Sequence, residues 1–155
     1  EDRRLEGILV KRDNPTILTP HPAEAARLLG CPVAAIQNDR IKAARELASR
    51  YRSHVALKGC GTVIANPEGD FWLNSTGNPG MATAGMGDVL SGLIVALLAQ
   101  GWPAVSALLA GVHLHGAAAD RLVAEGVGPI GLTAGEAIDA ARRVFNEWVG
   151  TGRAY

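Results

Sequence analysis

The segment with the clearest capacity for chemistry runs from Ser75 to Gly87 and is followed at once by Asp88. Four of its thirteen residues are glycine, and an apolar run begins directly after Asp88. This layout predicts a glycine-rich loop that leads into the N-terminus of a buried helix. Such a terminus offers unpaired N–H groups and the positive end of a dipole, and glycine lets the backbone approach an anion closely. The segment therefore predicts a phosphate-binding loop.

Asp88 is unexpected in a site that only binds phosphate, because its negative charge would repel the anion. A carboxylate at this position suits a general base or a substrate ligand. The helix dipole alone also favours an acidic residue in the first turn, so a purely structural role stays open. The loop lacks the Lys-Ser/Thr ending of a P-loop and does not match G-x-G-x-x-G, so neither of these motifs explains it.

Several separated segments together resemble one enzyme family. Residues 78–90 are similar to the signature of the nucleotide-dependent NAD(P)H-hydrate dehydratases, which belong to the ribokinase-like superfamily. Residues 18–24 and 57–62 match two further motifs of that family in the expected order, and the resemblance continues through 111–116 and 132–134. Spaced motifs of this kind are far more specific than any one of them alone.

The resemblance assigns a role to each motif. It implies that Asp88 is the catalytic residue and also touches the substrate, and that His21 contacts the hydrated nicotinamide. It also implies an adenine-nucleotide site built from two segments, in which a lysine ammonium suits phosphate as a point charge. The implied nucleotide-binding residues are Lys58, Gly59, Cys60, Gly61, Thr62, Asn78, Gly80, Thr83, Ala84, Gly85, Met86 and Gly87.

The implied activity is that of a lyase in metabolite repair. Family members restore NADH or NADPH from the hydrated forms NADHX and NADPHX by phosphorylating the ring hydroxyl and eliminating phosphate. ADP or ATP is the implied co-substrate, with Mg²⁺ bridging its phosphates and no all-protein metal cage. Two alternatives stay open: a ribokinase-like kinase acting on a vitamin precursor, against which the His21 motif argues, and an inactive nucleotide-binding fragment.

The fold that follows is α/β, since strands alternate with helices. The same alternation implies a largely parallel sheet, and the resemblance specifies the ribokinase-like three-layer α/β/α sandwich. The family domain is longer than this chain, so residues 1–150 are expected to be its C-terminal portion and residues 151–155 a frayed tail. Such a portion would expose a sheet edge and apolar patches. We therefore expect a homo-oligomer, or association with the missing N-terminal half.

The apolar periodicity and the turn signals predict the individual elements. The expected strands span residues 16–19, 55–57, 62–65 and 71–73, the last two forming a hairpin. The expected helices begin at Pro22, near Asn38 or Asp39, at Asp88, near Pro103 and at Ala134. The second helix should bury Ile41, Ala44, Leu47, Ala48 and Tyr51 and keep Arg40, Lys42, Arg45 and Arg50 in solvent. The last helix should bury Ile138, Ala141, Phe145 and Trp148.

Capping signals mark the ends of two of these helices. Pro22 suits a first helical position, Glu24 is placed for a capping box with His21, and Gly30 is a stop signal. Thr133 and Glu136 form a second capping box at the start of the last helix.

The composition excludes several classes of protein. The formal net charge is zero, so no electrostatic case exists for nucleic acid or membrane binding. Cys31 and Cys60 lie far apart without a C-x-x-C partner, which favours free thiols and a cytoplasmic location. His113 and His115 do not share a helix face and form a poor metal pair, while Asp120, one turn beyond, is expected to be structural. Residues 126–131 match G-x-G-x-x-G, but no strand precedes them.

Overall fold

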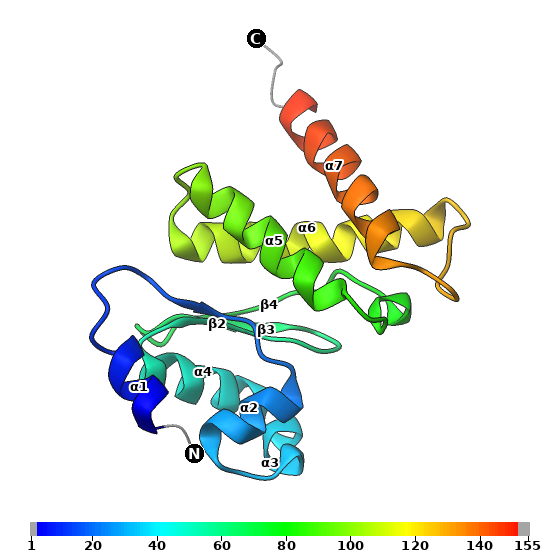
Figure 1. Ribbon diagram of the computed structural model, residues 1–155. Coiled ribbons are helices and arrows are strands. Elements are labelled where there is room, and N and C mark those ends of the chain that lie inside the picture. The colour runs from blue at the N-terminus through cyan, green and yellow to red at the C-terminus, as the bar shows by residue number, and fades with distance from the viewer. Residues whose placement is uncertain (1–2, 152–155) are drawn as a thin grey trace. The chain divides into compact units, whose positions relative to one another are not determined.

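The computed structural model of the protein describes residues 3–151 (Figure 1). The described residues form two compact units, one of residues 3–74 and 102–109 and the other of residues 75–101 and 110–151. Of the tail predicted to fray, residues 152–155 lie outside the described part, and the last helix ends at Thr151.

The first unit contains a four-stranded mixed sheet. Its strands follow the chain order: β1 (Ile17–Leu18), β2 (His54–Leu57), β3 (Val63–Ala65) and β4 (Phe71–Leu73). The β1–β2 pair is parallel, whereas β2–β3 and β3–β4 are antiparallel. The expectation of a largely parallel sheet is therefore wrong for these strands. Only short turns separate β2, β3 and β4, and a parallel pairing needs a crossover of a dozen residues or more. The predicted hairpin is confirmed.

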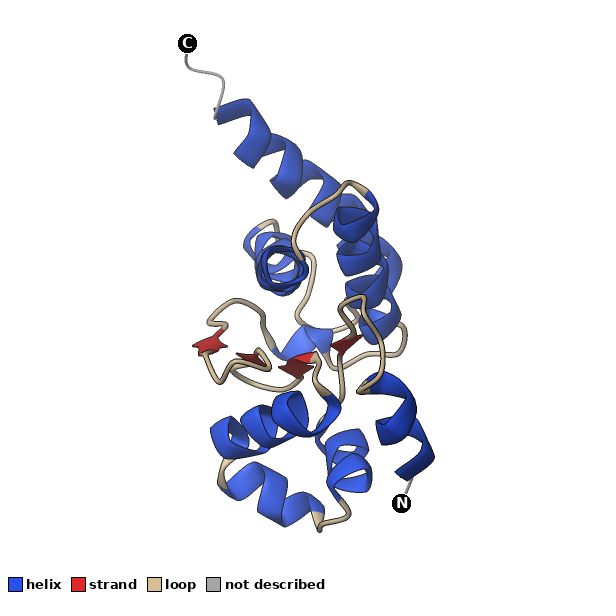
Figure 2. Ribbon diagram, turned by 90° about the vertical axis from the view of Figure 1, so that its left-hand side faces the viewer, coloured by secondary structure: helices blue, strands red, loops and turns tan. Residues whose placement is uncertain are grey.

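Four helices of the first unit lie along one face of this sheet (Figures 1 and 2). They are α1 (Arg3–Leu9), α2 (Pro22–Leu29), α3 (Val33–Asn38) and α4 (Arg40–Tyr51). The predicted apolar stripe of α4 is confirmed, with Ile41 at its margin: Ala44, Leu47, Ala48 and Tyr51 are buried in one cluster with β2 and β3. Helix α3 was not predicted from the sequence, because its six residues are too few to display the apolar periodicity of a helix.

The second unit is helical. A 3-10 turn, η1 (Pro79–Met81), precedes α5 (Met86–Ala99), and residues 110–124 of α6 (Ala104–Ala124) pack with α7 (Ala134–Thr151). The predicted stripe of α7 needs correction. Its buried residues are Ala137, Ala140, Ala141 and Val144, with Phe145 partly buried against them. Ile138 is 55% exposed and Trp148 is 38% exposed.

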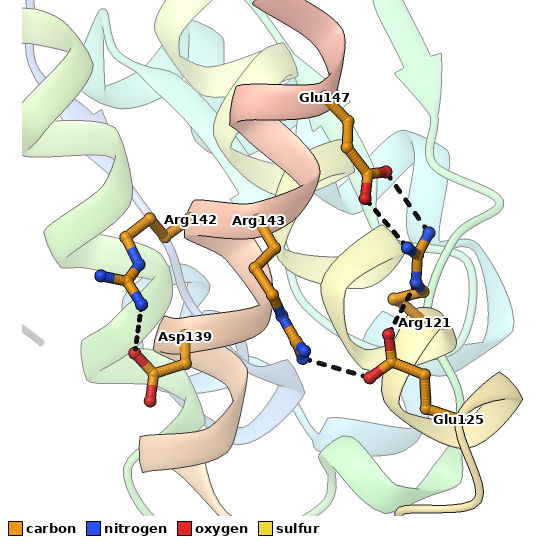
Figure 3. Close-up of polar contacts among 6 residues, drawn as sticks. All are labelled: Arg121, Glu125, Asp139, Arg142, Arg143 and Glu147. Carbon is orange, nitrogen blue, oxygen red and sulfur yellow. Dashed lines mark hydrogen bonds and ion pairs between the residues drawn. The ribbon is translucent and has the colours of Figure 1, made fainter.

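A network of ion pairs joins α6 to α7 on the surface of the second unit (Figure 3). Arg121 donates to Glu125 at 2.8 Å and to Glu147 at 2.9 Å, and Arg143 donates to Glu125 at 3.1 Å. The hydrogen bond from Arg121 is the main cause that lowers the pKa of Glu125. These groups are solvent-exposed, so the network fixes which residues of the two helices face each other more than it stabilises them.

His54, the first residue of β2, gives the first unit a pH-dependent stability. Burial lowers its pKa below the ordinary value of 6.5, against an opposing effect of Glu68, and its Nδ1 has no hydrogen-bond partner within residues 3–151. The unfolded chain therefore binds the proton more readily than the folded one, so stability is lost as the pH falls below 6.5. Thermal unfolding at pH 7.5 and 5.5 should show a smaller drop in Tm for His54→Gln than for the wild type. Equal drops would contradict this role.

Candidate active site

Two of the predicted site residues follow neighbouring strands of the first unit. Because β1 and β2 are parallel, their carboxyl ends meet at the same edge of the sheet. His21 follows β1 and Lys58 follows β2, and the backbone N–H of Lys58 donates to the carbonyl of Pro20 at 2.9 Å. The carboxyl ends of strands are where open α/β sheets bind ligands. The structure thus brings His21 and Lys58 to one edge of the sheet.

His21 is the N-cap of α2, and the predicted capping box is confirmed. Its Nδ1 accepts a hydrogen bond from the backbone N–H of Glu24 at 3.1 Å, while the Glu24 carboxylate accepts from the backbone N–H of His21 at 2.7 Å. Pro22 opens the helix and Gly30, at φ 68°, closes it. Since Nδ1 is an acceptor here, the neutral imidazole carries its proton on Nε2. The ring therefore offers Nε2–H as a donor to a ligand.

The segment after β2 is a tight turn held by its own backbone and by an arginine. Gly59 and Gly61 have φ values of 149° and 66°, a region that L side chains rarely adopt. The Thr62 hydroxyl donates to the carbonyl of Gly59 at 3.2 Å. Cys60 lies exposed between the two glycines. The glycine conformations and the Thr62 hydrogen bond fix the backbone of residues 59–62, which directly follow Lys58.

Arg40 of α4 contacts this turn, and its position differs from the prediction. It was expected on the solvated face of α4, but it is half-buried and donates to the carbonyls of Leu57 at 3.1 Å and Gly61 at 3.4 Å. A Cβ on Gly59 would overlap its guanidinium. The signal that could have found it is Gly59, whose missing side chain leaves room for the Arg40 guanidinium.

In the second unit, α6 anchors the glycine-rich loop through its side chains and backbone. The Asp120 carboxylate accepts from the backbone N–H of Gly77 at 2.8 Å and from the Asn78 amide at 3.0 Å. The Asn78 side-chain oxygen in turn accepts from the backbone N–H of Gly80 at 3.0 Å. The structural role expected of Asp120 is therefore confirmed. Because both its oxygens are engaged, Asp120 holds the loop at two points.

Glycines allow the loop to pack closely against its neighbours. A Cβ on Gly116 of α6 would overlap the Thr76 side chain and lie 2.7 Å from its carbonyl carbon, and the Thr76 hydroxyl donates to the carbonyl of His113 at 3.1 Å. A Cβ on Gly80 would lie 2.6 Å from the carbonyl oxygen of Pro129. Pro129 belongs to the second glycine-rich segment, residues 126–131, which joins α6 to α7. That segment packs against the loop and has no preceding strand, as predicted.

The loop ends at the N-terminus of α5. Gly85 is the N-cap at φ 86°, and its carbonyl accepts from the N–H groups of Asp88 and Val89 at 3.1 and 3.0 Å. The N–H groups of Met86 and Gly87 precede these first helical bonds and point out of the helix end. Residues 82–84 and Asp88 are exposed, whereas the Met86 side chain is buried. The predicted arrangement of glycine-rich loop, helix terminus and first-turn carboxylate is confirmed.

Residues 3–151 contain no group of three or more His, Cys, Asp and Glu side chains placed to hold a metal ion. None of the helices in the described part of the chain is both long and apolar enough to span a membrane.

Comparison with known proteins identifies relatives of the chain. The family model described as NAD(P)H-hydrate dehydratase matches residues 3–143, which begins earlier than the sequence motifs alone indicate. The ADP-dependent (S)-NAD(P)H-hydrate dehydratase of Neisseria meningitidis serogroup B is 53% identical over 131 residues, or 84% of this chain.

Solved structures agree with this match. The ADP/ATP-dependent NAD(P)H-hydrate dehydratase of Bacillus subtilis, co-crystallised with ATP and Mg²⁺, is 42% identical over 89% of this chain, with a TM-score of 0.85. A ribokinase-like superfamily protein of Enterococcus faecalis is 28% identical over 88% of this chain, with a TM-score of 0.73. The expected ribokinase-like α/β fold is therefore confirmed.

The chain spans 44% of the length of the Neisseria relative, 50% of the Bacillus chain and 46% of the Enterococcus chain. Within that span, the family model covers all three motif segments and both glycine-rich regions. On this evidence the chain belongs to the NAD(P)H-hydrate dehydratase family.

Proposed function

We propose that this chain takes part in the nucleotide-dependent dehydration of hydrated NADH and NADPH, a lyase reaction that repairs the cofactor. The observation that carries the proposal is the N-terminus of α5, where exposed loop residues and outward N–H groups lie beside the carboxylate of Asp88. An anion-binding terminus and a base are what phosphoryl transfer to a hydroxyl requires of a protein. The family membership of the chain supports the choice of substrate.

The proposed reaction has two steps. As Asp88 takes the proton of the ring hydroxyl, the hydroxyl oxygen bonds to the terminal phosphorus of the nucleotide. The bond from that phosphorus to its bridging oxygen breaks, so ADP leaves as AMP, or ATP leaves as ADP. Backbone N–H groups from Ala84 to Gly87 stabilise the negative charge that develops on the transferred phosphoryl group. The phosphate then leaves the ring carbon with the bonding electrons, and loss of a proton from the neighbouring carbon restores the double bond.

The proposal assigns binding roles to residues within each unit, taken separately. In the first unit, Lys58 pairs with nucleotide phosphate, the turn through Thr62 contacts the nucleotide, and His21 donates its Nε2–H to the hydrated ring. In the second unit, the loop segment from Asn78 to Gly87 binds phosphate. The lysine at the end of β2 and the glycine conformations of the turn that follows support the first assignment.

We propose ADP as the phosphoryl donor, with Mg²⁺ bridging its phosphates, and ATP as an alternative donor. The Neisseria relative, described as ADP-dependent, supports ADP. Mg²⁺ neutralises phosphate charge when it is bound, and the residues here supply orientation and proton transfer around it. The proposal also includes an assembly, formed either by several copies of the chain or with a further portion of the family domain. It includes a cytoplasmic location as well.

Incubation of the chain with NADHX, Mg²⁺ and either ADP or ATP tests this function. Recovery of NADH absorbance that requires nucleotide supports it, and the relative rates identify the donor. A phosphorylated product that accumulates without NADH would instead indicate a small-molecule kinase. Nucleotide binding without any product would indicate a nucleotide-binding module.

His21→Asn is expected to separate substrate binding from helix capping. Asparagine is a good N-cap residue, so α2 should stay capped and Tm should stay near the wild-type value. Loss of the imidazole removes one hydrogen bond to the hydrated ring, so the KM for NADHX should rise by about two- to tenfold. Steady-state kinetics should show an unchanged KM for ADP. Equal increases in both KM values would contradict a substrate contact.

A further inference from the structure

The Glu24 carboxylate touches more than its capping box requires. A capping box needs only the bond from the backbone N–H of His21, which Glu24 accepts at 2.7 Å. The same carboxylate also lies 3.4 Å from Nε2 of His21 and 3.8 Å from Nζ of Lys58. One acidic side chain therefore contacts both residues to which substrate binding is assigned in this unit.

We propose that Glu24 is a positioning residue that holds the His21 imidazole and the Lys58 ammonium in place and gives up Lys58 when a nucleotide phosphate arrives. The roles of His21 and Lys58 in this proposal rest on the proposed function. The backbone N–H of Glu24 holds the ring at Nδ1, while its carboxylate lies 3.4 Å from Nε2, longer than an ordinary hydrogen bond. Glu24 thus orients the imidazole through Nδ1 and leaves Nε2–H available to a ligand.

The ion pair between Glu24 and Lys58 is weak enough for a nucleotide phosphate to replace the carboxylate. Exposed fractions are 44% for the Glu24 side chain and 26% for that of Lys58, so water screens their attraction. A nucleotide phosphate carries more negative charge than a carboxylate and is a stronger partner for the ammonium. Binding of the nucleotide must then break the pair with Glu24, which weakens the observed affinity. Removing the carboxylate charge should therefore tighten nucleotide binding.

Calorimetric titration with ADP and Mg²⁺ tests this inference on the wild type, Glu24→Gln and Glu46→Gln. Glutamine still accepts the His21 N–H, so the cap of α2 is kept. Glu46→Gln makes the same charge change at an exposed position of α4 in the same unit. We expect Glu24→Gln to lower the Kd about two- to fivefold, as for the loss of a competing surface ion pair, with no change for Glu46→Gln. An unchanged or raised Kd, or equal effects in both variants, would overturn the proposal.

Two further readouts separate this role from a merely structural one. Without any ligand, the NMR signals of the Lys58 side chain, carbon-13 of Cε and nitrogen-15 of Nζ, should shift in Glu24→Gln. Unchanged signals would overturn the pairing. In the dehydration assay, kcat should fall while ADP binds more tightly, because the negative charge beside Nε2 of His21 is lost. A variant with a structural defect would show both a lower kcat and weaker ADP binding. The NMR signals do not depend on turnover, so the pairing is tested even if the dehydratase function is wrong.

Discussion

Replacement of Asp88 by Asn is expected to reduce kcat by about 10²- to 10⁴-fold, the usual contribution of a positioned general base. Asparagine has nearly the same shape but cannot accept the hydroxyl proton at neutral pH. Asp88 is exposed in the first turn of α5, so the substitution disturbs no packing. ADP binding, measured by calorimetry, should stay within a few-fold of the wild type, because backbone groups supply the phosphate contacts.

Asp139→Asn is the matched control for this experiment. Asp139 is also exposed on a helix of the second unit, where its carboxylate lies 3.5 Å from the Arg142 guanidinium (Figure 3). The control should keep wild-type kcat and ADP affinity. Turnover of Asp88→Asn within a few-fold of the wild type would exclude Asp88 as the base and leave the helix dipole as the reason for an acid at this position.

Gly116→Ala is expected to have the largest effect on the structure of the loop. The added methyl group would overlap Thr76, and its contact with the carbonyl carbon of that residue cannot be relieved by a side-chain rotation. Overpacking of this kind costs about 1–3 kcal/mol. Denaturant unfolding should show that loss, and ADP affinity should fall as well, because Thr76 leads directly into the segment that Asp120 anchors.

Gly92→Ala provides the control. Gly92 is exposed on α5 and a Cβ there meets nothing within 4 Å. Alanine is the better helix former by about 1 kcal/mol, so this variant should be as stable as the wild type or more stable. Wild-type stability and ADP affinity in Gly116→Ala would show that the close approach of the loop to α6 contributes neither to stability nor to nucleotide binding.

The local signals in the sequence predicted local structure well. The capping boxes at His21 and Thr133 are present, because each depends on residues within one turn of the helix. The glycine-rich loop and first-turn Asp88 were placed correctly for the same reason. The roles of these residues toward ligands stay predictions, which the variants above test.

Features that depend on distant parts of the chain could not be predicted in this way. Arg40 looked like one of several solvated arginines, since nothing in α4 shows that its guanidinium meets the turn after β2. The pattern of α7 indicated bulky Ile138 as a buried residue, but the close approach of neighbouring helices selects alanines such as Ala137 and Ala140 instead. The mixed sheet was missed because the alternation of strands and helices, and not the short turns between β2, β3 and β4, set the expectation.

The measurement that tests the central claim most directly follows the oxygen of the ring hydroxyl. NADHX labelled with oxygen-18 at that hydroxyl is incubated with the chain, ADP and Mg²⁺, and the products are analysed by mass spectrometry. If the hydroxyl oxygen attacks phosphorus, the label appears in inorganic phosphate, in equal amount to the NADH formed. Label that appears in water while NADH is formed would contradict phosphoryl transfer, and with it the roles assigned to the α5 terminus and Asp88.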